Sequence, residues 1–323
     1  MPGNNCPAVS VIIPCYKVSA YIAETLDSVR RQTFRDFEAI VVNDGCPDTV
    51  NLERALAPYS QEIVYIKQEN MGSAGARNTG IRTARASILA FLDADDAWEP
   101  EYLDYQCRIL TERPDVDLVY SNAVQFGASG DGPLIMDRFP SRGEVTLRSL
   151  LNKECQVFGG LVARREIMTR AGYYDSRIRF SEDFDMWLRV AKLGGRFAYH
   201  DRPLYKYRSH SGNKTGDKIR GIRSVISILE MRRETLAVSP SERQWFDEAL
   251  CRERAKLDFL LGRRAVYAGN RVEALQYLSR ARRVIKRRKL GVTIVALKVT
   301  PRLLFRYVRY RYPTEHAFVS GVE

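Results

Sequence analysis

The chain has 323 residues, of which 45% are apolar and 28% are charged. This composition is that of a folded globular protein, and it excludes the disordered, collagenous and disulfide-scaffold classes. The 51 Lys and Arg residues outnumber the 39 Asp and Glu residues, and the resulting net charge of +12 indicates an anionic partner: nucleic acid, a phosphorylated substrate or an anionic membrane surface.

Short apolar runs alternate with helical periodicity through the first part of the chain. Strands are predicted at residues 8–14, 37–42, 62–66, 87–92 and 117–120. Helices are predicted between and after them, at residues 18–34, 48–58, 73–85 and 100–112. This alternation predicts an α/β fold, an open sheet with helices on both faces. Ligands bind such sheets at the carboxyl ends of the strands, so the segments that follow the strands form the candidate site.

Those segments lack the two commonest phosphate-binding motifs. The first strand leads into Pro14-Cys-Tyr-Lys-Val-Ser19, which contains no glycine, so the dinucleotide fingerprint is absent, and no P-loop occurs either. Acids stand there instead, in Asn43-Asp44 and in Asp93-Ala94-Asp95-Asp96. Three acids in four residues repel one another unless a cation or solvent compensates them. Magnesium and manganese favour oxygen ligands, so both a divalent cation site and a solvated, helix-capping turn fit this pattern.

Five segments occur in an order that identifies a family. They are Ser10-Val-Ile-Ile-Pro-Cys-Tyr16, Val41-Val-Asn-Asp-Gly45, Asn70-Met-Gly-Ser-Ala-Gly-Ala-Arg-Asn-Thr-Gly80, Phe91-Leu-Asp-Ala-Asp-Asp96 and Ser181-Glu-Asp-Phe-Asp-Met-Trp187. Together they closely resemble glycosyltransferase family 2, the inverting nucleotide-sugar enzymes with the GT-A fold. The resemblance covers about residues 8–212. It implies a GT-A type nucleotide-binding sheet flanked by helices, which a C-terminal all-helical extension would follow.

The resemblance implies a donor site for a nucleotide-diphosphate sugar. Its residues would be Pro14, Tyr16, Asp44, Arg77 and Asp93. Asp44 resembles the acid that contacts the base, and since a carboxylate can accept the imide N–H of uracil, a UDP-linked donor is expected. This sequence departs from many relatives in having Asn43 in place of Asp and Cys46-Pro47 in place of Ser-Thr.

The resemblance also implies a divalent metal, Mn or Mg, at the diphosphate. Asp95 would ligate the metal, while Asp93 would contact ribose or sugar. Such an ion acts as a Lewis acid on the departing diphosphate. His210 stands where many GT-A enzymes have a further metal or diphosphate ligand, although a single histidine also serves as a structural hydrogen-bonding residue. Asp96 is expected either to hold the metal- and donor-binding residues in position or to cap the next helix.

An acceptor hydroxyl that attacks the sugar needs a base, and Glu182-Asp183 matches the acidic pair of the family. Asp183 is expected to be the catalytic base, and Glu182 to lie at the acceptor or to support Asp183. Ser181 can cap the following helix and so expose Asp183 at its first turn. Acids in a first turn also simply complement the helix dipole. Trp187 is expected either in the wall of the acceptor site or in the core.

The last third of the chain is helical and carries the charge. Residues 263–323 hold 15 Lys and Arg and 3 Asp and Glu, a net of +12, so the remaining residues are neutral overall. The predicted domains are a GT-A catalytic domain over 1–215, a helical appendage over 216–285 that resembles one tetratricopeptide-type pair, and a basic amphipathic tail over 286–323. Basic residues mixed with apolar and aromatic ones suit a helix on anionic lipid, although a solvated basic face with apolar residues in the core would show the same pattern.

The resemblance, together with the basic tail, implies a metal-dependent inverting glycosyltransferase of cell-envelope polysaccharide or glycolipid synthesis, with a saccharide or lipid-linked acceptor. A nucleotidyltransferase is the alternative enzyme, and a nucleic-acid-binding protein that uses the basic tail is the alternative class. The start of the chain does not resemble a secretory signal, and the apolar run near residues 290–297 is too short to span a bilayer. A cytoplasmic protein with reduced cysteines that associates peripherally with the cytoplasmic membrane is therefore expected.

Overall fold

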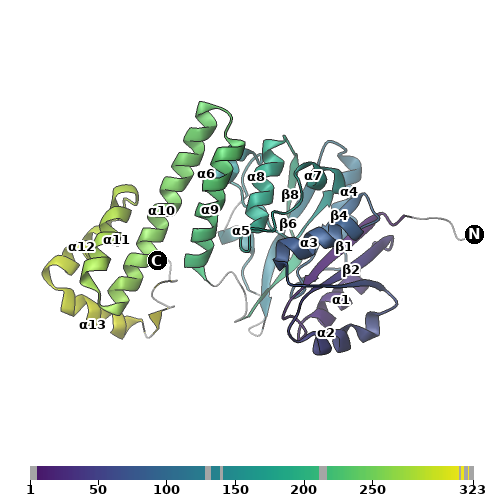
Figure 1. The fold of residues 1–323 in the computed structure, drawn as a ribbon, viewed down its shortest axis with the longest axis horizontal. Coiled ribbons are helices and arrows are strands. Elements are labelled where there is room, and N and C mark those ends of the chain that lie inside the picture. The colour runs from purple at the N-terminus through teal and green to yellow at the C-terminus, as the bar shows by residue number, and fades with distance from the viewer. Residues whose placement is uncertain are drawn as a thin grey trace, which may run out of the picture. The chain divides into compact units, whose positions relative to one another are not determined.

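The computed structural model describes residues 6–127, 132–138, 141–210, 217–312, 314–315 and 319. The chain divides into two compact units, Met1–Asn213 and Lys214–Glu323. In Figure 1 the first unit runs from purple to teal and the second from green to yellow. The first unit carries the sheet and the second is helical, so the expected combination of an α/β domain with a C-terminal helical region is confirmed.

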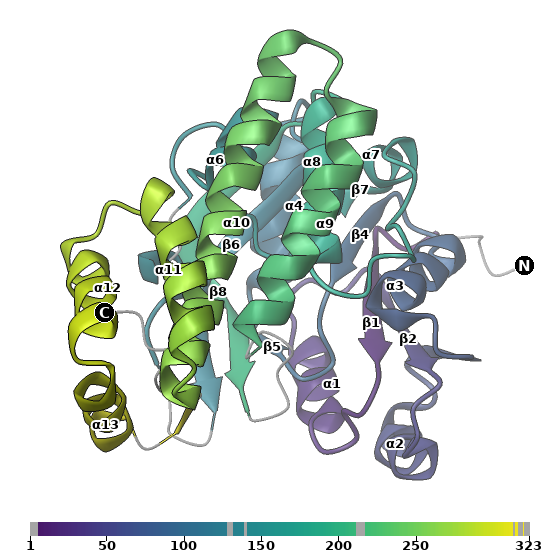
Figure 2. The ribbon, with the colours of Figure 1, turned by 60° about the vertical axis from the view of Figure 1, so that its left-hand side comes forward.

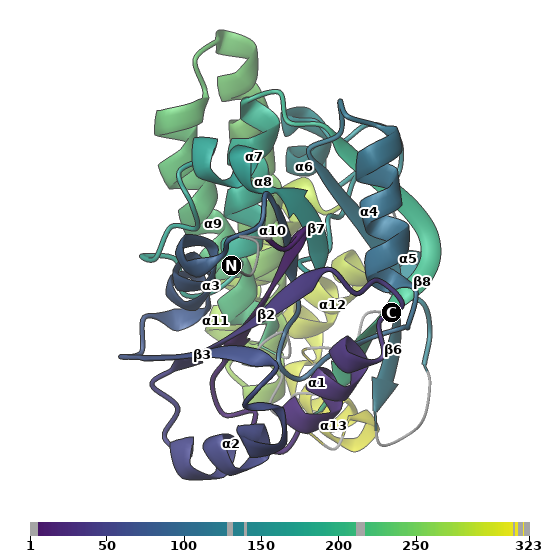
Figure 3. The same cartoon turned by 90° about the vertical axis from the view of Figure 1, so that its right-hand side faces the viewer.

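Eight strands of the described residues form one sheet in the order β3-β2-β1-β4-β7-β6-β8-β5. Their bounds are β1 Val9–Cys15, β2 Phe37–Asp44, β3 Ile63–Gln68, β4 Ile88–Phe91, β5 Ala97–Trp98, β6 Leu118–Gly127, β7 Leu161–Arg164 and β8 Phe197–Ser209. The first four in chain order, β1 to β4, pair in parallel, and β2 and β3 lie side by side in Figure 3. All five strands expected from the sequence are present.

The other half of the sheet is mixed. Strand β7 pairs antiparallel with both β4 and β6, β6 and β8 are parallel, and β5 pairs antiparallel with β8. Strands β5, β7 and β8 were not expected from the sequence. The first two have two and four residues, and β8 has mostly half-buried and exposed side chains, so none of them shows the long apolar run that predicts a buried strand.

Helices cover the sheet of the first unit. Their bounds are α1 Ile22–Arg30, α2 Thr49–Leu56, α3 Gly72–Thr83, α4 Tyr102–Glu112, α5 Ile135–Arg138, α6 Leu147–Asn152, α7 Arg165–Arg170 and α8 Glu182–Lys192, with a short 3-10 turn at Ala57–Tyr59. Helix α3 packs closely on the sheet at Gly80, where a Cβ atom would lie 2.4 Å from Cγ2 of Ile12. This close approach sets the position of α3 against β1 and therefore of the polar side chains that α3 carries.

The second unit consists of helices throughout its described residues. Their bounds are α9 Lys218–Leu236, α10 Pro240–Ala268, α11 Arg271–Val284, α12 Arg288–Val299 and α13 Pro301–Arg311. Ser239 and Glu242 form a capping box at the start of α10, and Gly269 ends that helix in the left-handed conformation. Figure 2 shows α9 and α11 alongside α10.

The basic tail packs on this helical unit through one side. Leu290 and Leu297 of α12 and Val308 of α13 are buried in one cluster with apolar residues of α10 and α11. The tail is therefore folded rather than detached along residues 288–311. Among the helices of the described residues, none combines the length and the apolar composition that crossing a bilayer requires.

Candidate functional site

The carboxyl ends of β1 and β2 place two of the expected donor residues next to each other. Cys15 pairs with Asn43 in the parallel ladder, so the residues that follow them, Tyr16 and Asp44, occupy neighbouring positions at the edge of the sheet. Pro14 is half-buried, and the Tyr16 side chain is 40% exposed. An accessible aromatic ring beside a carboxylate is an arrangement that can hold a nucleoside, whose base has a flat face and polar edges.

Asp44 is buried and held in place by the segment that leads into α3. Its Oδ1 atom accepts hydrogen bonds from Gln68 Nε2 at 2.7 Å and from the backbone N–H of Met71 at 2.8 Å. Its carbonyl oxygen accepts a third, from Asn70 Nδ2 at 3.0 Å. Both of these side-chain hydrogen bonds, within the described part of the chain, end on Oδ1, so Oδ2 is the atom of the carboxylate that we expect a ligand to meet.

Asn43, the departure from the family pattern, serves the turn behind Asp44. Its Nδ2 atom donates to Thr49 Oγ1 at 3.1 Å and to the Tyr65 hydroxyl at 2.8 Å, and its Oδ1 accepts the backbone N–H of Cys46 at 2.9 Å. An ionised Asp in this position would only accept hydrogen bonds. The asparagine thus completes a local network, and Asp44 keeps its place at the strand end.

The acidic turn after β4 faces the end of β8. The Asp95 Oδ2 atom lies 2.9 Å from Nε2 of His210, although 115 positions separate the two residues in the sequence. Burial raises the pKa of Asp95, the charge of Asp93 raises it further, and the hydrogen bond with His210 opposes both effects. A carboxylate oxygen and an imidazole nitrogen therefore lie side by side in a place where negative charge is unfavourable.

Asp96 lies behind this turn and fixes it to β8. Its Oδ2 accepts from the Tyr205 hydroxyl at 2.8 Å, and its Oδ1 accepts from the backbone N–H of Arg208 at 2.7 Å. Burial raises the pKa of Asp96 well above its usual range, and the charges of Asp93 and Asp95 act in the same direction. Asp96 thus connects the acidic turn to β8 from the interior, and its role toward the metal- and donor-binding residues stays a prediction.

Arg208 is a site residue that sequence reasoning missed. Its Nε atom donates to the carbonyl oxygen of Asp95 at 2.6 Å, and its Nη2 atom forms an ion pair with Glu24 at 2.5 Å. The guanidinium also stacks over the rings of Tyr21 and Phe126. A signal existed in the sequence: Arg208 and His210 are two positions apart at the end of a strand, so their side chains share one face.

Arg77 joins the acidic turn to the acidic pair of α8. Its guanidinium is buried and lies 2.7 Å from Asp93 Oδ1, 2.7 Å from Glu182 Oε1 and 3.4 Å from Asp183 Oδ1. Burial alone would lower its pKa, but the charges of Asp183, Asp93 and Glu182 outweigh burial and hold the pKa well above its usual range. The site therefore contains one buried cation between three carboxylates that come from two distant segments.

Helix α8 presents its acidic pair from a constrained backbone. Ser181 precedes the helix in the left-handed conformation, with φ of 61°, which costs energy for a residue other than glycine. Its position is that of the expected cap, but its side chain makes no capping hydrogen bond. Gly159 lies against the first turn of α8, because a Cβ atom at this position would lie only 2.5 Å from Oδ2 of Asp183. Gly159 is thus a second site residue that the motif search missed.

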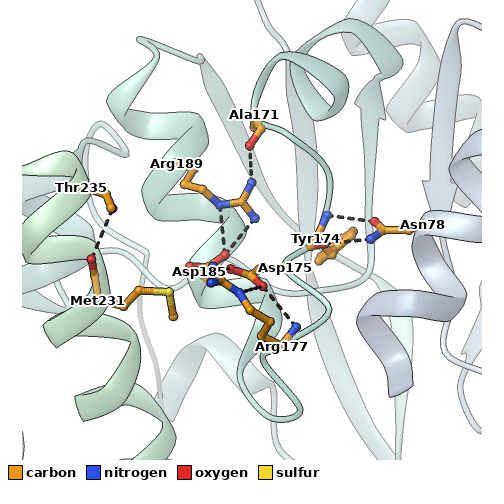
Figure 4. Close-up of polar contacts among 9 residues, drawn as sticks. All are labelled: Asn78, Ala171, Tyr174, Asp175, Arg177, Asp185, Arg189, Met231 and Thr235. Carbon is orange, nitrogen blue, oxygen red and sulfur yellow. Dashed lines mark hydrogen bonds and ion pairs between the residues drawn. The ribbon is translucent and has the colours of Figure 1, made fainter. Parts of the chain in front are cut away.

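The rest of α8 is anchored in the core. Trp187 is buried, and its ring packs edge-on to that of Phe197, so the structure decides for the core rather than for a wall of the acceptor site. Arg189 donates to Asp185 at 2.8 Å one turn away and also to the carbonyl oxygen of Ala171 (Figure 4). The ion pair lies within α8, and the hydrogen bond to Ala171 ties the helix to the segment that precedes it.

A reciprocal pair of hydrogen bonds holds α3 against that same segment. Asn78 Nδ2 donates to the carbonyl oxygen of Tyr174 at 2.8 Å, and its Oδ1 accepts the backbone N–H of Tyr174 at 2.9 Å (Figure 4). Asn78 directly follows Arg77 in α3. Helix α3 is therefore held by polar contacts at two neighbouring positions: Arg77 pairs with Glu182 of α8, and Asn78 bonds to the segment that leads into α8.

We expect Gly159→Ala to lower turnover about tenfold to a hundredfold and to change the free energy of unfolding little. The new methyl group would displace the Asp183 carboxylate by up to about one ångström. Steady-state kinetics and thermal unfolding would measure both effects. Gly160→Ala is the matched control, since its methyl group would lie 1.9 Å from the buried Tyr205 ring and should mainly destabilise the fold. Full turnover in Gly159→Ala would show that the contact between residue 159 and Asp183 does not control the position of the carboxylate.

Known proteins match both the sequence and the fold. The sequence profile of the family described as "Glycosyl transferase family 2" matches residues 10–172. The chain is 32% identical over 218 residues to "Uncharacterized glycosyltransferase EpsJ" of Bacillus subtilis, with 65% of this chain and 63% of that protein covered. It is 27% identical over 215 residues to "Uncharacterized glycosyltransferase RP339" of Rickettsia prowazekii, with 65% and 66% covered. The chain thus spans less than two thirds of the length of these relatives.

Two solved structures share the fold. Residues 1–349 of S. aureus TarS in complex with UDP-GlcNAc align with a TM-score of 0.62 at 18% identity, over 94% of this chain and 91% of that one. The mannosyltransferase PcManGT from Pyrobaculum calidifontis, in complex with GDP-Man and Mn²⁺, aligns with a TM-score of 0.59 at 17% identity, over 98% and 86%. At these identities the likeness concerns the fold, which is of the GT-A type.

Proposed function

The chain belongs to glycosyltransferase family 2, and on that premise we propose that it moves a sugar from a nucleotide-diphosphate sugar to an acceptor hydroxyl with inversion at the anomeric carbon. One observation carries the proposal: Arg77 bridges Asp93, at the nucleotide edge of the sheet, and the Glu182–Asp183 pair of α8. These contacts support a single site that combines the proposed donor edge with the proposed base. The match to the family supports glycosyltransferase activity.

The donor we propose is a UDP-linked sugar held at the ends of β1, β2 and β4. The exposed Tyr16 ring would lie against the base, and the free Oδ2 side of Asp44 would accept the imide N–H of uracil. A structural neighbour of the chain was solved with UDP-GlcNAc, and another with GDP-Man. The two neighbours support a nucleotide-sugar donor, and the carboxylate at position 44 is the reason to favour uracil.

Asp95 and His210 would hold a divalent metal, Mn or Mg, together with the diphosphate. Within the described part of the chain no group of three or more His, Cys, Asp and Glu side chains could hold a metal. Two protein ligands nevertheless fit, because Mg²⁺ and Mn²⁺ in such sites take their remaining ligands from phosphates and water. Burial and the charge of Asp93 raise the pKa of Asp95, and a bound cation would oppose both effects. When bound, the metal would supply Lewis-acid stabilisation of the leaving diphosphate.

Asp183 is the base in the proposed reaction. The acceptor oxygen attacks the anomeric carbon while Asp183 takes the hydroxyl proton, and the bond between that carbon and the diphosphate oxygen breaks with its electron pair on the diphosphate. A single displacement reverses the anomeric configuration. Arg77, at 3.4 Å, would hold the Asp183 carboxylate in position, and Asp93 would contact the ribose or the sugar from the opposite side of Arg77.

The acceptor we propose is a saccharide or a lipid-linked saccharide of cell-envelope polysaccharide or glycolipid synthesis. We propose a catalytic domain over residues 1–215, followed by a helical appendage over residues 216–285 that resembles one tetratricopeptide-type pair. The basic tail over 286–323 would place the enzyme at the cytoplasmic face of the membrane, where lipid-linked acceptors are found. Residues 263–323, which include this tail, carry the net charge of +12 against a neutral remainder of the chain, and this supports the location.

A panel of nucleotide sugars with and without Mn²⁺ tests donor and metal together. We expect a UDP-sugar with Mn²⁺ to raise the unfolding temperature and to be consumed in the presence of acceptor, and exhaustive chelation to reduce turnover to background. Thermal shift and release of the nucleoside diphosphate are the measurements. Asp95→Asn should lose the metal-dependent part of the shift, whereas the exposed Asp104→Asn should keep it. Full turnover after chelation would remove the metal from the proposal.

A further inference from the structure

The outer surface of α12 and α13 combines exposed apolar side chains with basic ones. Of the fifteen large apolar side chains that are exposed among the described residues, six lie between positions 292 and 310. These six are Val292 (69% exposed), Val295 (60%), Val299 (73%), Leu303 (67%), Tyr307 (61%) and Tyr310 (87%). Apolar side chains gathered in this way on a folded unit indicate a surface that meets another apolar phase.

In α12 the exposed apolar residues share one face. Val292, Val295 and Val299 follow the spacing of three and four residues that aligns side chains along a helix. Leu290 and Leu297 are buried in the core of the helical unit. The helix therefore has two apolar faces, and packing within the unit accounts for only one of them.

Helix α13 repeats the arrangement with aromatic rings. Leu303, Tyr307 and Tyr310 are spaced by four and three residues, so they too share a face, whereas Val308 is the residue that packs inward. Tyrosine combines an apolar ring with a polar hydroxyl, and this suits it to the boundary between lipid and water.

Basic side chains border both exposed faces. On α12 they are Arg288, Lys289 and Lys298, and on α13 they are Arg302, Arg306 and Arg311, all of them exposed. No Asp or Glu occurs between Glu273 and Glu315, so nothing within this part of the sequence balances their charge. Long basic side chains can lay their stems along an apolar surface and keep their charges in contact with phosphates.

We propose that this α12–α13 face, made of the six apolar and six basic residues named above, binds the surface of a membrane that contains anionic phospholipid. The valines, the leucine and the tyrosine rings would enter the boundary between headgroups and acyl chains, while the basic residues meet lipid phosphates. The aliphatic side chains favour lipid over nucleic acid, which offers phosphates and stacking bases but no apolar phase for valine. The inference rests on the proposed membrane location and names the surface responsible for it.

Co-sedimentation of the full chain with vesicles tests the charge requirement. We expect binding to vesicles that contain phosphatidylglycerol and little binding to vesicles of phosphatidylcholine alone. Replacing Arg302, Arg306 and Arg311 by Gln should weaken binding about fivefold for each residue, or roughly a hundredfold together. Gln at three exposed arginines of other segments, Arg31, Arg113 and Arg223, is the control of equal charge and should change binding much less.

Replacing Val292, Val295 and Val299 by Ser tests insertion separately from charge. We expect binding to fall about tenfold with no loss of thermal stability, because these side chains are exposed in the folded unit. Val238→Ser with Val272→Ser is the matched control, since both valines are 76% exposed in the same unit outside the α12–α13 face.

Three outcomes would overturn the proposal. They are equal binding to vesicles without anionic lipid, unchanged binding of the valine variant, and tight binding of an RNA or DNA oligonucleotide that depends on the same arginines while vesicles do not bind. The last outcome would identify a nucleic-acid surface instead. A thermal shift with UDP and Mn²⁺ on the same protein reports on the donor site, so its failure would count against the proposed function and leave the vesicle result standing.

Discussion

Asp183→Asn is expected to lower kcat by about two to four orders of magnitude, which is the range that a positioned general base contributes. The amide has nearly the shape of the carboxylate, so the tight contact with Gly159 is kept while the ability to take a proton is lost. Donor affinity should change little, because Asp93 and the ends of β1 and β2 keep their positions. Single-turnover kinetics at saturating donor, with donor binding measured by calorimetry, would separate the two quantities.

The control for this variant is Asp104→Asn. Asp104 is an exposed acid in the first turn of α4, so it shares with Asp183 a favourable interaction with a helix N-terminus but lies outside the site. Loss of that interaction alone costs no more than about 1 kcal/mol of stability and should leave kcat unchanged. Turnover near the wild-type value in Asp183→Asn would exclude Asp183 as the base, and Glu182 would then be the acid to test.

Arg77→Met is expected to abolish transfer and to lower the free energy of unfolding by about 3–5 kcal/mol. The substitution keeps most of the volume but leaves Asp93, Glu182 and Asp183 facing one another without the buried cation that separates them. Removing one partner of a buried ion pair is costly for this reason. Urea unfolding followed by circular dichroism would measure the loss.

Arg85→Met is the matched control for stability. Arg85 also pairs with a buried glutamate, Glu38 at 2.8 Å, but the Arg85 side chain is exposed. In the variant Glu38 keeps the hydrogen bonds from the Ser10 hydroxyl and from the backbone N–H of residue 85, so we expect a loss of only about 1 kcal/mol. Equal losses in the two variants would mean that burial of Arg77 adds nothing to the energy of its network.

Arg77→Lys separates charge from geometry. A lysine restores a positive charge but has no planar fork, so it cannot reach Asp93 and Glu182 with two fixed N–H groups at once. We expect it to recover part of the stability and little of the turnover. Full recovery of both would show that neutralising the carboxylates is the whole contribution of Arg77, and that it positions nothing.

The parallel half of the sheet was predictable because its signal is local. Strands β1 and β2 are almost fully buried along their length, and a strand that is buried on both faces shows as a continuous apolar run. Strands β5 and β8 pair across more than 100 residues at positions such as Ala97 and Lys206, and β8 has no comparable run. Their assignment depended on partners that local periodicity does not identify.

The acidic motifs were predictable as candidates, but their relations to one another were not. Asp44, Asp93 and Asp95 follow apolar strands, and parallel strands bring such ends to one edge of a sheet, so their proximity follows from the pattern. Arg77 was expected to touch the donor, and that remains a prediction. Its contact with Glu182, at a separation of 105 residues, appears only in the folded chain.

The sequence by itself determined the class of the protein, its family and the concentration of net charge in the last 61 residues, since these depend on composition, order and local spacing. The tertiary structure decided what each side chain faces. It buried Trp187, set Gly159 against Asp183, placed Arg77 between three carboxylates and left one side of α12 and α13 exposed. The physical reason is that burial and charge pairing depend on which distant segments pack together, and a local pattern does not encode that choice.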